Sequence, residues 1–296
     1  MCQTCGCAAP RTDRAAGDAA DARTVAVMRS LLDANDAEAV HNRAHLEASG
    51  VLALNLMSSP GSGKTALLEA TIDALAGRVR VAVIEGDLET ENDAARIRAK
   101  GVPAVQITTG TACHLDAGMV HGALHRLQLS DIDILFIENV GNLVCPASFD
   151  LGHHANITLL SVTEGDDKPS KYPVMFRAAD LVAITKTDLL PAIDDFDIDR
   201  AVANLRALAN PAPALALSAR RPQSLAPWLA WLDFMLARLR TGERLRPAIQ
   251  RDGALVHAVG DTPHAAHHHP HGGAHAHGHD GGDRGRADGQ PHGAGS

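Results

Sequence analysis

The chain of 296 residues is 45% hydrophobic and 3% aromatic, which supplies a sizeable core and favours helices and buried parallel strands over an aromatic-rich β-sandwich. Its formal net charge of −8 at pH 7, without an offsetting basic cluster, argues against nucleic-acid binding. No apolar run reaches membrane-spanning length and no signal peptide opens the chain, so we expect a cytoplasmic protein with no membrane partner.

Composition predicts three parts. Residues 1–22 form a short Cys-bearing leader, which lacks apolar periodicity and is expected to be flexible. Residues 23–247 have the composition of one globular domain. Residues 248–296 are rich in Gly, His, Pro and Asp with almost no large apolar side chain, so this tail is expected to be disordered.

Within the globular part, apolar strands alternate with amphipathic helices. After a first helix at 25–48, strands are predicted at 51–57, 80–85, 102–107, 132–138, 157–162, 181–185 and 214–217. Helical patterns lie between and after them, at 65–75, 91–100, 115–127, 199–208 and 224–239. This alternation predicts an α/β fold, a mostly parallel sheet with helices on both faces, in which ligands bind at the carboxyl ends of the strands.

A phosphate-binding loop is predicted between the strand at 51–57 and the next helix. Residues 58–65 read Ser-Ser-Pro-Gly-Ser-Gly-Lys-Thr, which matches the P-loop pattern G-x-x-x-x-G-K-[ST] except that Ser58 replaces the first Gly. Backbone N–H groups of such a loop surround the phosphates, while Lys64 reaches the β- and γ-phosphates and Thr65 holds Mg²⁺. The predicted nucleotide-binding residues here are Pro60, Gly61, Ser62, Gly63, Lys64, Thr65 and Ala66. An ordinary Gly/Ser-rich turn is the alternative.

Two carboxylates end predicted strands near this loop. Asp87 closes the second strand and Glu138 closes the fourth, with Gly141 shortly after it. Carboxylates in such places hold Mg²⁺ or its waters, and a Gly just beyond can sense the γ-phosphate through its N–H. We therefore predict Thr65, Asp87 and Glu138 as magnesium ligands and, with Lys64, as the catalytic residues. Solvated turn carboxylates are the alternative.

The choice of base is predicted from two later segments. Thr185-Lys186-Thr187-Asp188 resembles the guanine-reading N-K-x-D element of GTPases, in which the Asp accepts hydrogen bonds from guanine and the Lys covers the base plane. Here Thr185 replaces the Asn. Ser218-Ala219 looks like the S-A element that lies against the base, although Arg-Arg-Pro follows it. Lys186, Asp188, Ser218 and Ala219 are thus predicted to bind the base of GTP, with ATP as the alternative.

The five cysteines suggest metal sites, since thiols stay reduced in the cytosol. A C-x-x-C-G-C leader places three thiols within six residues, which suits Ni²⁺ or Zn²⁺, and the alternative is a redox-active or accidental cluster. Its predicted ligands are Cys2, Cys5 and Cys7. A second predicted set, on consecutive strand-end segments, comprises Cys113, His114 and Cys145.

The tail is predicted to bind metal ions weakly, because neutral imidazoles at high density bind Ni²⁺, Cu²⁺ or Zn²⁺. A natural His-rich tail is favoured over an expression tag because Gly, Ala, Pro and Asp are interspersed. The candidate ligands are His267, His268, His269, His271, His275, His277 and His279.

Together these motifs resemble the HypB family, the nickel-insertion GTPases of [NiFe]-hydrogenase maturation. The resemblance covers the globular region nearly end to end and is most specific at residues 58–65, 84–87, 113–116, 138–146 and 161–169. It implies a SIMIBI-class P-loop domain that hydrolyses GTP, dimerises with GTP, and uses GTP, Mg²⁺, Ni²⁺ and Zn²⁺. No Gln or Arg finger is evident in the sequence to orient the attacking water, so we expect slow hydrolysis. The family often carries its His-rich segment near the N-terminus, whereas this chain has it at the other end.

The same resemblance implies roles for the cysteines and for partners. The leader cysteines would hold nickel tightly, and Cys113, His114 and Cys145 would form a nickel or zinc site at the dimer interface. Implied partners are a second copy of the chain, a HypA-type nickel chaperone and the precursor of the hydrogenase large subunit. Alternative functions are a nickel storage protein with vestigial hydrolysis and a urease-type maturation GTPase.

Overall fold

The computed structural model describes residues 13–89, 91–251 and 254–256 of the chain. All of them belong to one compact unit, which spans residues 1–259. Several predicted metal ligands lie outside the described residues, namely Cys2, Cys5, Cys7, His267, His268, His269, His271, His275, His277 and His279.

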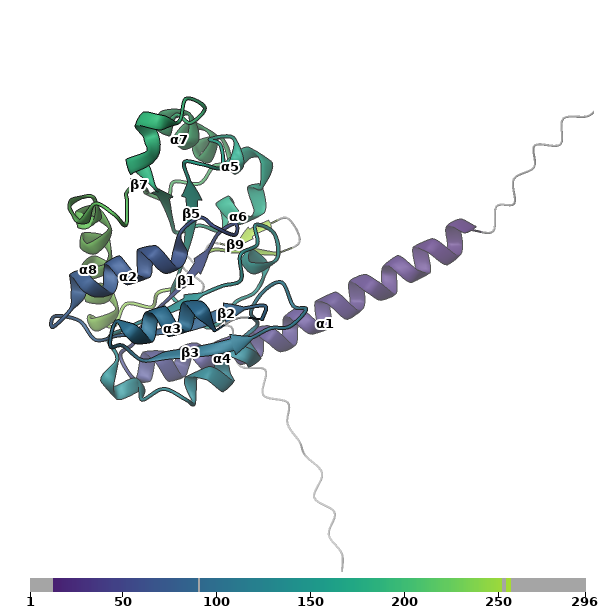
Figure 1. Cartoon of the computed structure of the whole chain (residues 1–296). Helices are drawn as coiled ribbons and strands as arrows, with labels where there is room; N and C mark the ends of the chain where they lie inside the picture. Colours follow the sequence, from purple (N-terminus) through teal and green to yellow (C-terminus); the bar gives the residue numbers. More distant parts are fainter. Residues whose placement is uncertain (1–12, 90, 252–253, 257–296) are drawn as a thin grey trace, which may run out of the picture. The chain divides into compact units, whose positions relative to one another are not determined.

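A parallel sheet of seven strands forms the centre of this unit (Figure 1), in the order β3-β2-β4-β1-β5-β6-β7. The strands are β1 (Leu52–Met57), β2 (Val81–Asp87), β3 (Ala104–Thr108), β4 (Ile134–Glu138), β5 (Ala155–Ser161), β6 (Leu181–Thr185) and β7 (Ala214–Ala216). Every residue of β1, β4, β5 and β6 is buried, as expected for apolar strands covered on both faces. All seven predicted strands are confirmed, with their ends shifted by a few residues.

Helices are found at all six predicted positions. They are α1 (Asp13–Ala48), α2 (Lys64–Leu75), α3 (Asn92–Ala99), α4 (Ala117–Leu124), α7 (Ile198–Ala207) and α8 (Ala226–Arg240). Two short helices between β5 and β6 were not predicted, α5 (Lys168–Lys171) and α6 (Pro173–Arg177). Among the described residues, no helix is both long and apolar enough to cross a membrane.

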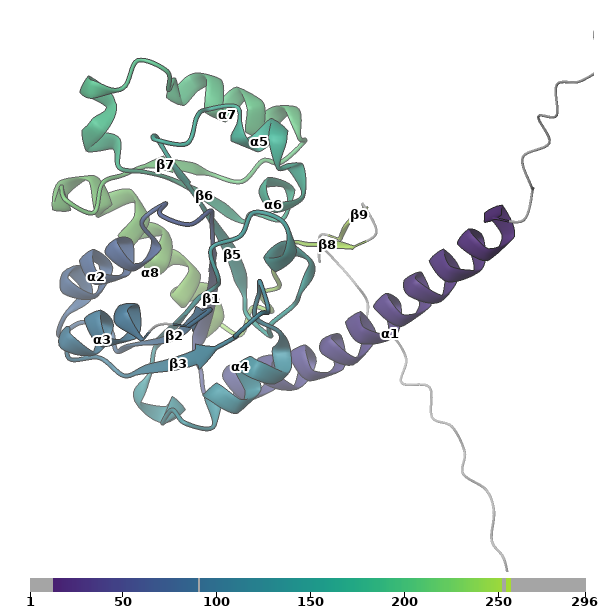
Figure 2. The same cartoon turned by 45° about the vertical axis from the view of Figure 1, so that its right-hand side comes forward.

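The helices form two layers, and alternate strand residues face each layer. Leu54 and Phe136 point to one side, where they pack with α2, α3 and α8. Ala53 and Leu135 point to the other side, where they pack with α1 and α4, while α6 and α7 cover the β5–β6 end of that side. Figure 2 shows α2 and α8 together on one side of the central strands. The predicted arrangement of helices on both faces is confirmed.

Helix α1 begins earlier than predicted. The expectation that residues 1–22 lack regular structure is wrong from Asp13 onward, where α1 starts. The first turns of α1 are rich in Ala, the residue with the highest intrinsic helix propensity, so a helix forms there without an apolar stripe. The apolar periodicity that predicted a helix start at residue 25 is present only in the later part of α1, which packs against the sheet.

The C-terminal segment also retains structure past the predicted boundary. Strands β8 (Ile249–Arg251) and β9 (Ala254–Val256) pair antiparallel, so the expectation of disorder from residue 248 is wrong for this hairpin. In the sequence, Asp252-Gly253 separates the two strands, and Asp-Gly is a pair favoured in two-residue hairpin connections. Three-residue strands are too short for the apolar pattern on which the prediction relied.

Candidate functional site

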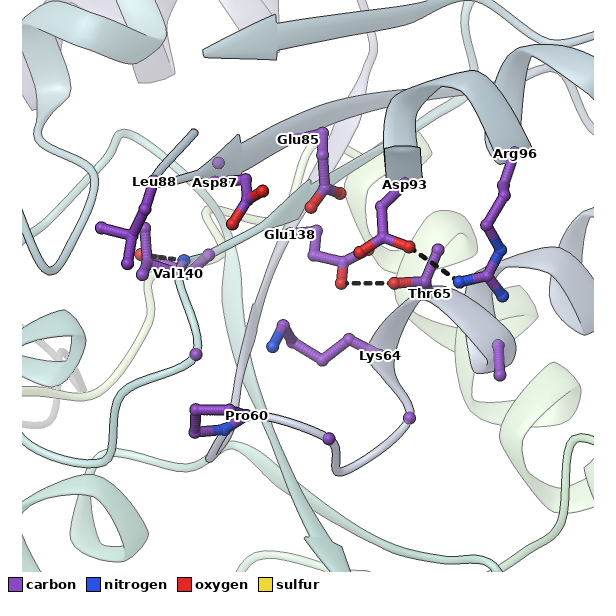
Figure 3. Close-up of a pocket in the computed structure, with 16 residues that line it drawn as sticks. Pro60, Lys64, Thr65, Glu85, Asp87, Leu88, Asp93, Arg96, Glu138 and Val140 are labelled. Carbon is purple, nitrogen blue, oxygen red and sulfur yellow. Dashed lines mark hydrogen bonds and ion pairs between the residues drawn. The ribbon is translucent and has the colours of Figure 1, made fainter. Parts of the chain in front are cut away.

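The phosphate loop joins β1 to α2 at the carboxyl end of the sheet. Gly63, directly before α2, has φ = 93°, a left-handed conformation that glycine adopts without strain. Lys64 is buried, and its ammonium donates a hydrogen bond to Ser58 Oγ at 3.1 Å. The serine that replaces the first Gly of the pattern therefore contacts the lysine. The loop and the start of α2 line a cavity of about 400 Å³ (Figure 3).

Two buried carboxylates lie side by side in this cavity. Strands β2 and β4 pair with Glu85 opposite Glu138, and Glu138 Oε1 accepts a hydrogen bond from Thr65 Oγ1 at 2.9 Å. Asp93 of α3 approaches from the side, so that one oxygen from each of the three carboxylates lies within 4.8 Å of the others. Thr65 and Glu138, both predicted, are thus brought together. Asp87 lines the same cavity but is not one of these three groups (Figure 3).

Burial raises the pKa of both carboxyl groups, Glu85 and Glu138. Burial, reinforced by the nearby Glu138, raises the pKa of Glu85 to about 11. Burial also raises the pKa of Glu138, against the opposing effect of the Lys64 ammonium. The Oε2 atoms of both glutamates lack a hydrogen-bond partner. Buried carboxylate oxygens beside a threonine hydroxyl form the oxygen-rich set that Mg²⁺ prefers, so these residues fit the predicted ion.

Gly141 lies directly against the phosphate loop. A Cβ added there would be 2.9 Å from Pro60 Cα and 3.0 Å from Pro60 N, so only glycine fits. Gly141 also lines the phosphate cavity, two residues after Asn139, whose own side chain is buried. The segment after β4 therefore lies against the loop through backbone atoms. The predicted contact of the Gly141 N–H with the γ-phosphate stays a prediction.

A second cavity of about 320 Å³ begins where the first ends, since Gly63 and Ala66 line both. It contains the predicted base-binding residues, together with part of the phosphate loop: Ser62, Lys186, Asp188, Ser218 and Ala219. Ser218 Oγ donates a hydrogen bond to Asp188 Oδ1 at 2.6 Å, and this bond lowers the pKa of the Asp188 carboxyl. An ionised carboxylate held in this way can accept from a base that offers N–H donors.

The segment after β6 is attached to the phosphate loop. The Thr185 hydroxyl donates to Ser62 O at 2.7 Å, and the Lys186 ammonium donates to Gly61 O at 2.6 Å. Lys186 adopts a left-handed conformation with φ = 58°, which turns its side chain over the loop. Threonine, in place of the Asn of the N-K-x-D element, therefore connects the base-binding segment to the phosphate loop by a hydrogen bond.

The predicted metal cluster combines the loop before α4 with the start of a short 3-10 helix, Cys145–Ser148. Cys113 Sγ lies 3.2 Å from Cys145 Sγ and 3.7 Å from His114 Nδ1, and both thiols are free. The His114 ring stacks on Phe149 at 3.9 Å between centroids, and burial lowers the pKa of its imidazole. A neutral imidazole and two adjacent thiols are suitable ligands for a borderline metal ion.

The metal cluster and the phosphate loop share one surface hollow. Cys113 lines it together with Pro60 and Gly141, and its volume is about 440 Å³. Asn142 Nδ2 donates to Cys113 O at 3.1 Å, and Asn142 directly follows Gly141 in the chain. The contact between the phosphate loop and Gly141 thus continues through one residue to the metal cluster.

Three charged residues that line the phosphate cavity were not predicted as site residues: Glu85, Asp93 and Arg96. Arg96 pairs with Asp93 at 2.7 Å and with Glu69 at 2.7 Å, and so orients α3 at the cavity rim. Glu85 is a charged residue in a mostly apolar strand, and this pattern in the sequence could have indicated a functional residue. Its position opposite Glu138 depends on the register between β2 and β4, which no local pattern contains.

The fold and the two cavities therefore define a nucleotide-binding P-loop domain. Comparison with known proteins supports this class. The family described as "CobW/HypB/UreG, nucleotide-binding domain" matches residues 52–214. The hydrogenase maturation factor HypB of Azotobacter vinelandii is 52% identical over 227 residues, which cover 77% of this chain and 73% of the relative. HypB of Escherichia coli strain K12 is 52% identical over 211 residues, covering 71% and 72%.

Solved structures give the same result. The crystal structure of HypB from Helicobacter pylori in complex with nickel has a TM-score of 0.66 and 44% identity, and covers 71% of this chain and 97% of that one. HypB from Archaeoglobus fulgidus has a TM-score of 0.65 and 38% identity, with coverages of 69% and 100%. This chain belongs to the HypB family of hydrogenase maturation factors.

Proposed function

We propose that this protein is a GTP-hydrolysing nickel metallochaperone that delivers Ni²⁺ during maturation of a [NiFe]-hydrogenase. The observation that carries the proposal is the hollow in which Cys113 of the metal cluster lies with Pro60 and Gly141 of the phosphate site. A change in the phosphates at one end of this hollow would alter the spacing of the thiols at the other. The proposed cargo agrees with the nickel bound to the H. pylori relative.

The base cavity supports GTP over ATP. Asp188 is oriented by Ser218 with its carboxylate in the cavity, where guanine would present its N1–H and 2-amino donors. Adenine offers no such pair of donors to a carboxylate. Lys64 would neutralise charge on the phosphates, and Thr65, Glu138 and the carboxylates beside it would hold Mg²⁺. When bound, Mg²⁺ would stabilise the charge that develops on the transferred phosphoryl group.

The proposed nickel site would take three ligands from one chain, Cys113, His114 and Cys145, which leaves coordination positions open. A second copy of the chain that meets this face would fill them, so we propose a GTP-dependent homodimer with nickel or zinc at its interface. The proposed exchange partners are a HypA-type nickel chaperone and the hydrogenase large-subunit precursor. Hydrolysis would separate the two copies and release the ion.

Asp188→Asn tests the base assignment. The Asn side chain would place an N–H donor opposite the N–H donors of guanine. GTP affinity should therefore fall roughly 10- to 100-fold, which corresponds to the loss of one hydrogen bond to a charged group. Xanthosine triphosphate, which has a 2-oxo group in place of the amine, should bind the variant better than GTP does. Binding is measured by titration calorimetry with GTP, ATP and xanthosine triphosphate. Equal affinity of the unsubstituted protein for GTP and ATP would contradict the assignment.

The coupling is tested by the metal content per monomer, measured with GDP and with a non-hydrolysable GTP analogue. We expect nickel occupancy to differ between the two nucleotides in the unsubstituted protein. Cys113→Ala/Cys145→Ala should abolish that difference while leaving GTP affinity unchanged, because neither thiol lines the phosphate or base cavity. Identical nickel occupancy with both nucleotides would refute the proposed switch but not the GTP assignment.

A further inference from the structure

Four histidines gather where α1 and α4 pack, away from the predicted ligand sets. His41 and His45 lie one turn apart on α1, and His121 and His125 lie one turn apart on α4 and just after it. Spacing of four residues places each pair on one helix face. Ring centroids are 5.0 Å apart for His41 and His121 and 6.0 Å apart for His45 and His125, so the two pairs face each other.

Within this four-histidine cluster, the Nε2 atoms of the two histidines on and just after α4 lie next to each other. His121 Nε2 and His125 Nε2 are 2.9 Å apart. Two nitrogens that each bind one ion at about 2.1 Å lie roughly 3.0 Å apart at a right angle and roughly 3.4 Å apart in a tetrahedron. Without an ion the two rings share a hydrogen bond at this distance, and the separation is already close to that of two ligands at a right angle. His45 Nδ1 is buried and has no hydrogen-bond partner, so a further nitrogen is available.

Neighbouring groups orient the rings as metal ligands require. His121 Nδ1 lies 3.1 Å from Glu38 Oε1 and 3.0 Å from Asn42 Oδ1, so this nitrogen carries a proton and its Nε2 is left for an ion. A carboxylate behind a histidine is the usual support of a metal ligand. The helices themselves are held together, because Asn42 donates to Ala117 O at 2.8 Å and Ala117 N donates to Asn35 Oδ1 at 2.8 Å.

We propose that the four-histidine cluster binds one borderline divalent ion of the Zn²⁺ or Ni²⁺ type. His121 and His125 are its first ligands, and His45 and His41 complete it once their rings turn toward the ion. Imidazole nitrogens favour such ions over Mg²⁺ or Ca²⁺. An ion bound here would join α1 to α4. Helix α4 begins three residues after His114, which belongs with Cys113 to the metal cluster described above.

Thermal unfolding of the full-length protein tests the site, since an ion stabilises a folded domain only through ligands that folding holds together. The test uses the Cys113→Ser/Cys145→Ser background, which removes both thiols of the Cys113–His114–Cys145 cluster, with excess Mg²⁺ present to occupy the carboxylates of the phosphate cavity. ZnCl₂, and in a second series NiCl₂, should raise the Tm by several degrees. Addition of His121→Gln/His125→Gln should remove the rise, and the series with the larger rise identifies the preferred ion.

The matched control is His267→Gln/His268→Gln, which removes two imidazoles from the C-terminal segment and should leave the rise unchanged. His41→Gln/His45→Gln repeats the test from α1 in case the α4 variant is unstable without metal. The proposal is overturned if neither ion raises the Tm in the Cys-substituted background, or if the rise persists in both His-substituted variants. Neither result bears on nucleotide binding, so the proposed function is tested separately.

Discussion

Single residues decide how the phosphate loop meets the segment after β4. Gly141 touches the Pro60 backbone, whereas Thr185 and Lys186 donate to loop carbonyls from the opposite side. The loop is therefore held between two strand ends, and its shape depends on atoms that are not part of it. At Gly141 the backbone of one segment meets the backbone of the other, so no side chain can rotate to make room for an added group.

Gly141→Ala should lower nucleotide affinity at least tenfold, because the added methyl group would displace the backbone at Pro60. The control is Gly122→Ala in α4, where an added Cβ meets nothing within 4 Å. Alanine also favours the helix there, so this variant should keep its affinity and gain slightly in stability. Fluorescence titration with a labelled nucleotide provides the measurement. Unchanged affinity in Gly141→Ala would show that the loop can shift without cost.

At the scale of elements, α1 is attached to the sheet by buried polar contacts more than by an apolar stripe. Arg43 donates to both oxygens of Asp150 at 2.5 and 2.7 Å, and through Nε to His153 O at 3.2 Å. Burial raises the pKa of Asp150, but the Arg43 guanidinium, together with His153 and the Gly152 backbone N–H, holds that pKa below its usual value. This ion pair therefore specifies where α1 docks.

Arg43→Met should destabilise the protein by about 3–5 kcal/mol, because it leaves the Asp150 carboxylate buried without its partner. The double variant Arg43→Met/Asp150→Leu should recover much of that loss. Arg78→Met is the exposed control, as Arg78 pairs with Asp233 at 3.0 Å with both side chains about half exposed, and should cost less than about 1 kcal/mol. Urea unfolding measures all three. Similar losses for Arg43→Met and Arg78→Met would contradict the docking role.

Across the whole domain, one buried carboxyl group connects the sheet to the C-terminal segment. Asp180 precedes β6 and accepts hydrogen bonds from Asn156 N at 2.7 Å and Ala248 N at 3.4 Å. Burial raises its pKa to about 7, although both backbone donors oppose the shift. Between the unfolded value near 3.8 and about 7, the folded state alone binds this proton, so stability falls as the pH rises through that window.

Asp180→Asn should reduce the loss of stability between pH 5 and pH 8 by on the order of 2 kcal/mol, because the amide stays neutral at both values. Its oxygen can still accept from Asn156 N. Asp194→Asn, at an exposed position, controls for the loss of one carboxylate. The free energy of unfolding is measured in urea at the two pH values. An unaltered pH dependence in Asp180→Asn would mean that this proton is not taken up on folding.

Most of the fold could be predicted because its signals are local. Each apolar strand and each amphipathic helix shows its period within one segment, and the order of segments leaves few sheet topologies. The predictions fail where the signal is weak or of another kind. The early turns of α1 form by helix propensity without a stripe, and β8 and β9 are too short to show alternation.

The amino-acid sequence by itself determined the parallel α/β sheet, the phosphate loop and the residue types at each strand end, because each depends on a few consecutive residues. Only the tertiary structure decided which distant groups meet. Strand register sets Glu85 opposite Glu138, and helix packing sets His121 and His125 against α1. Such contacts join segments far apart in the chain, and their geometry arises from the packing of the whole domain rather than from any local pattern.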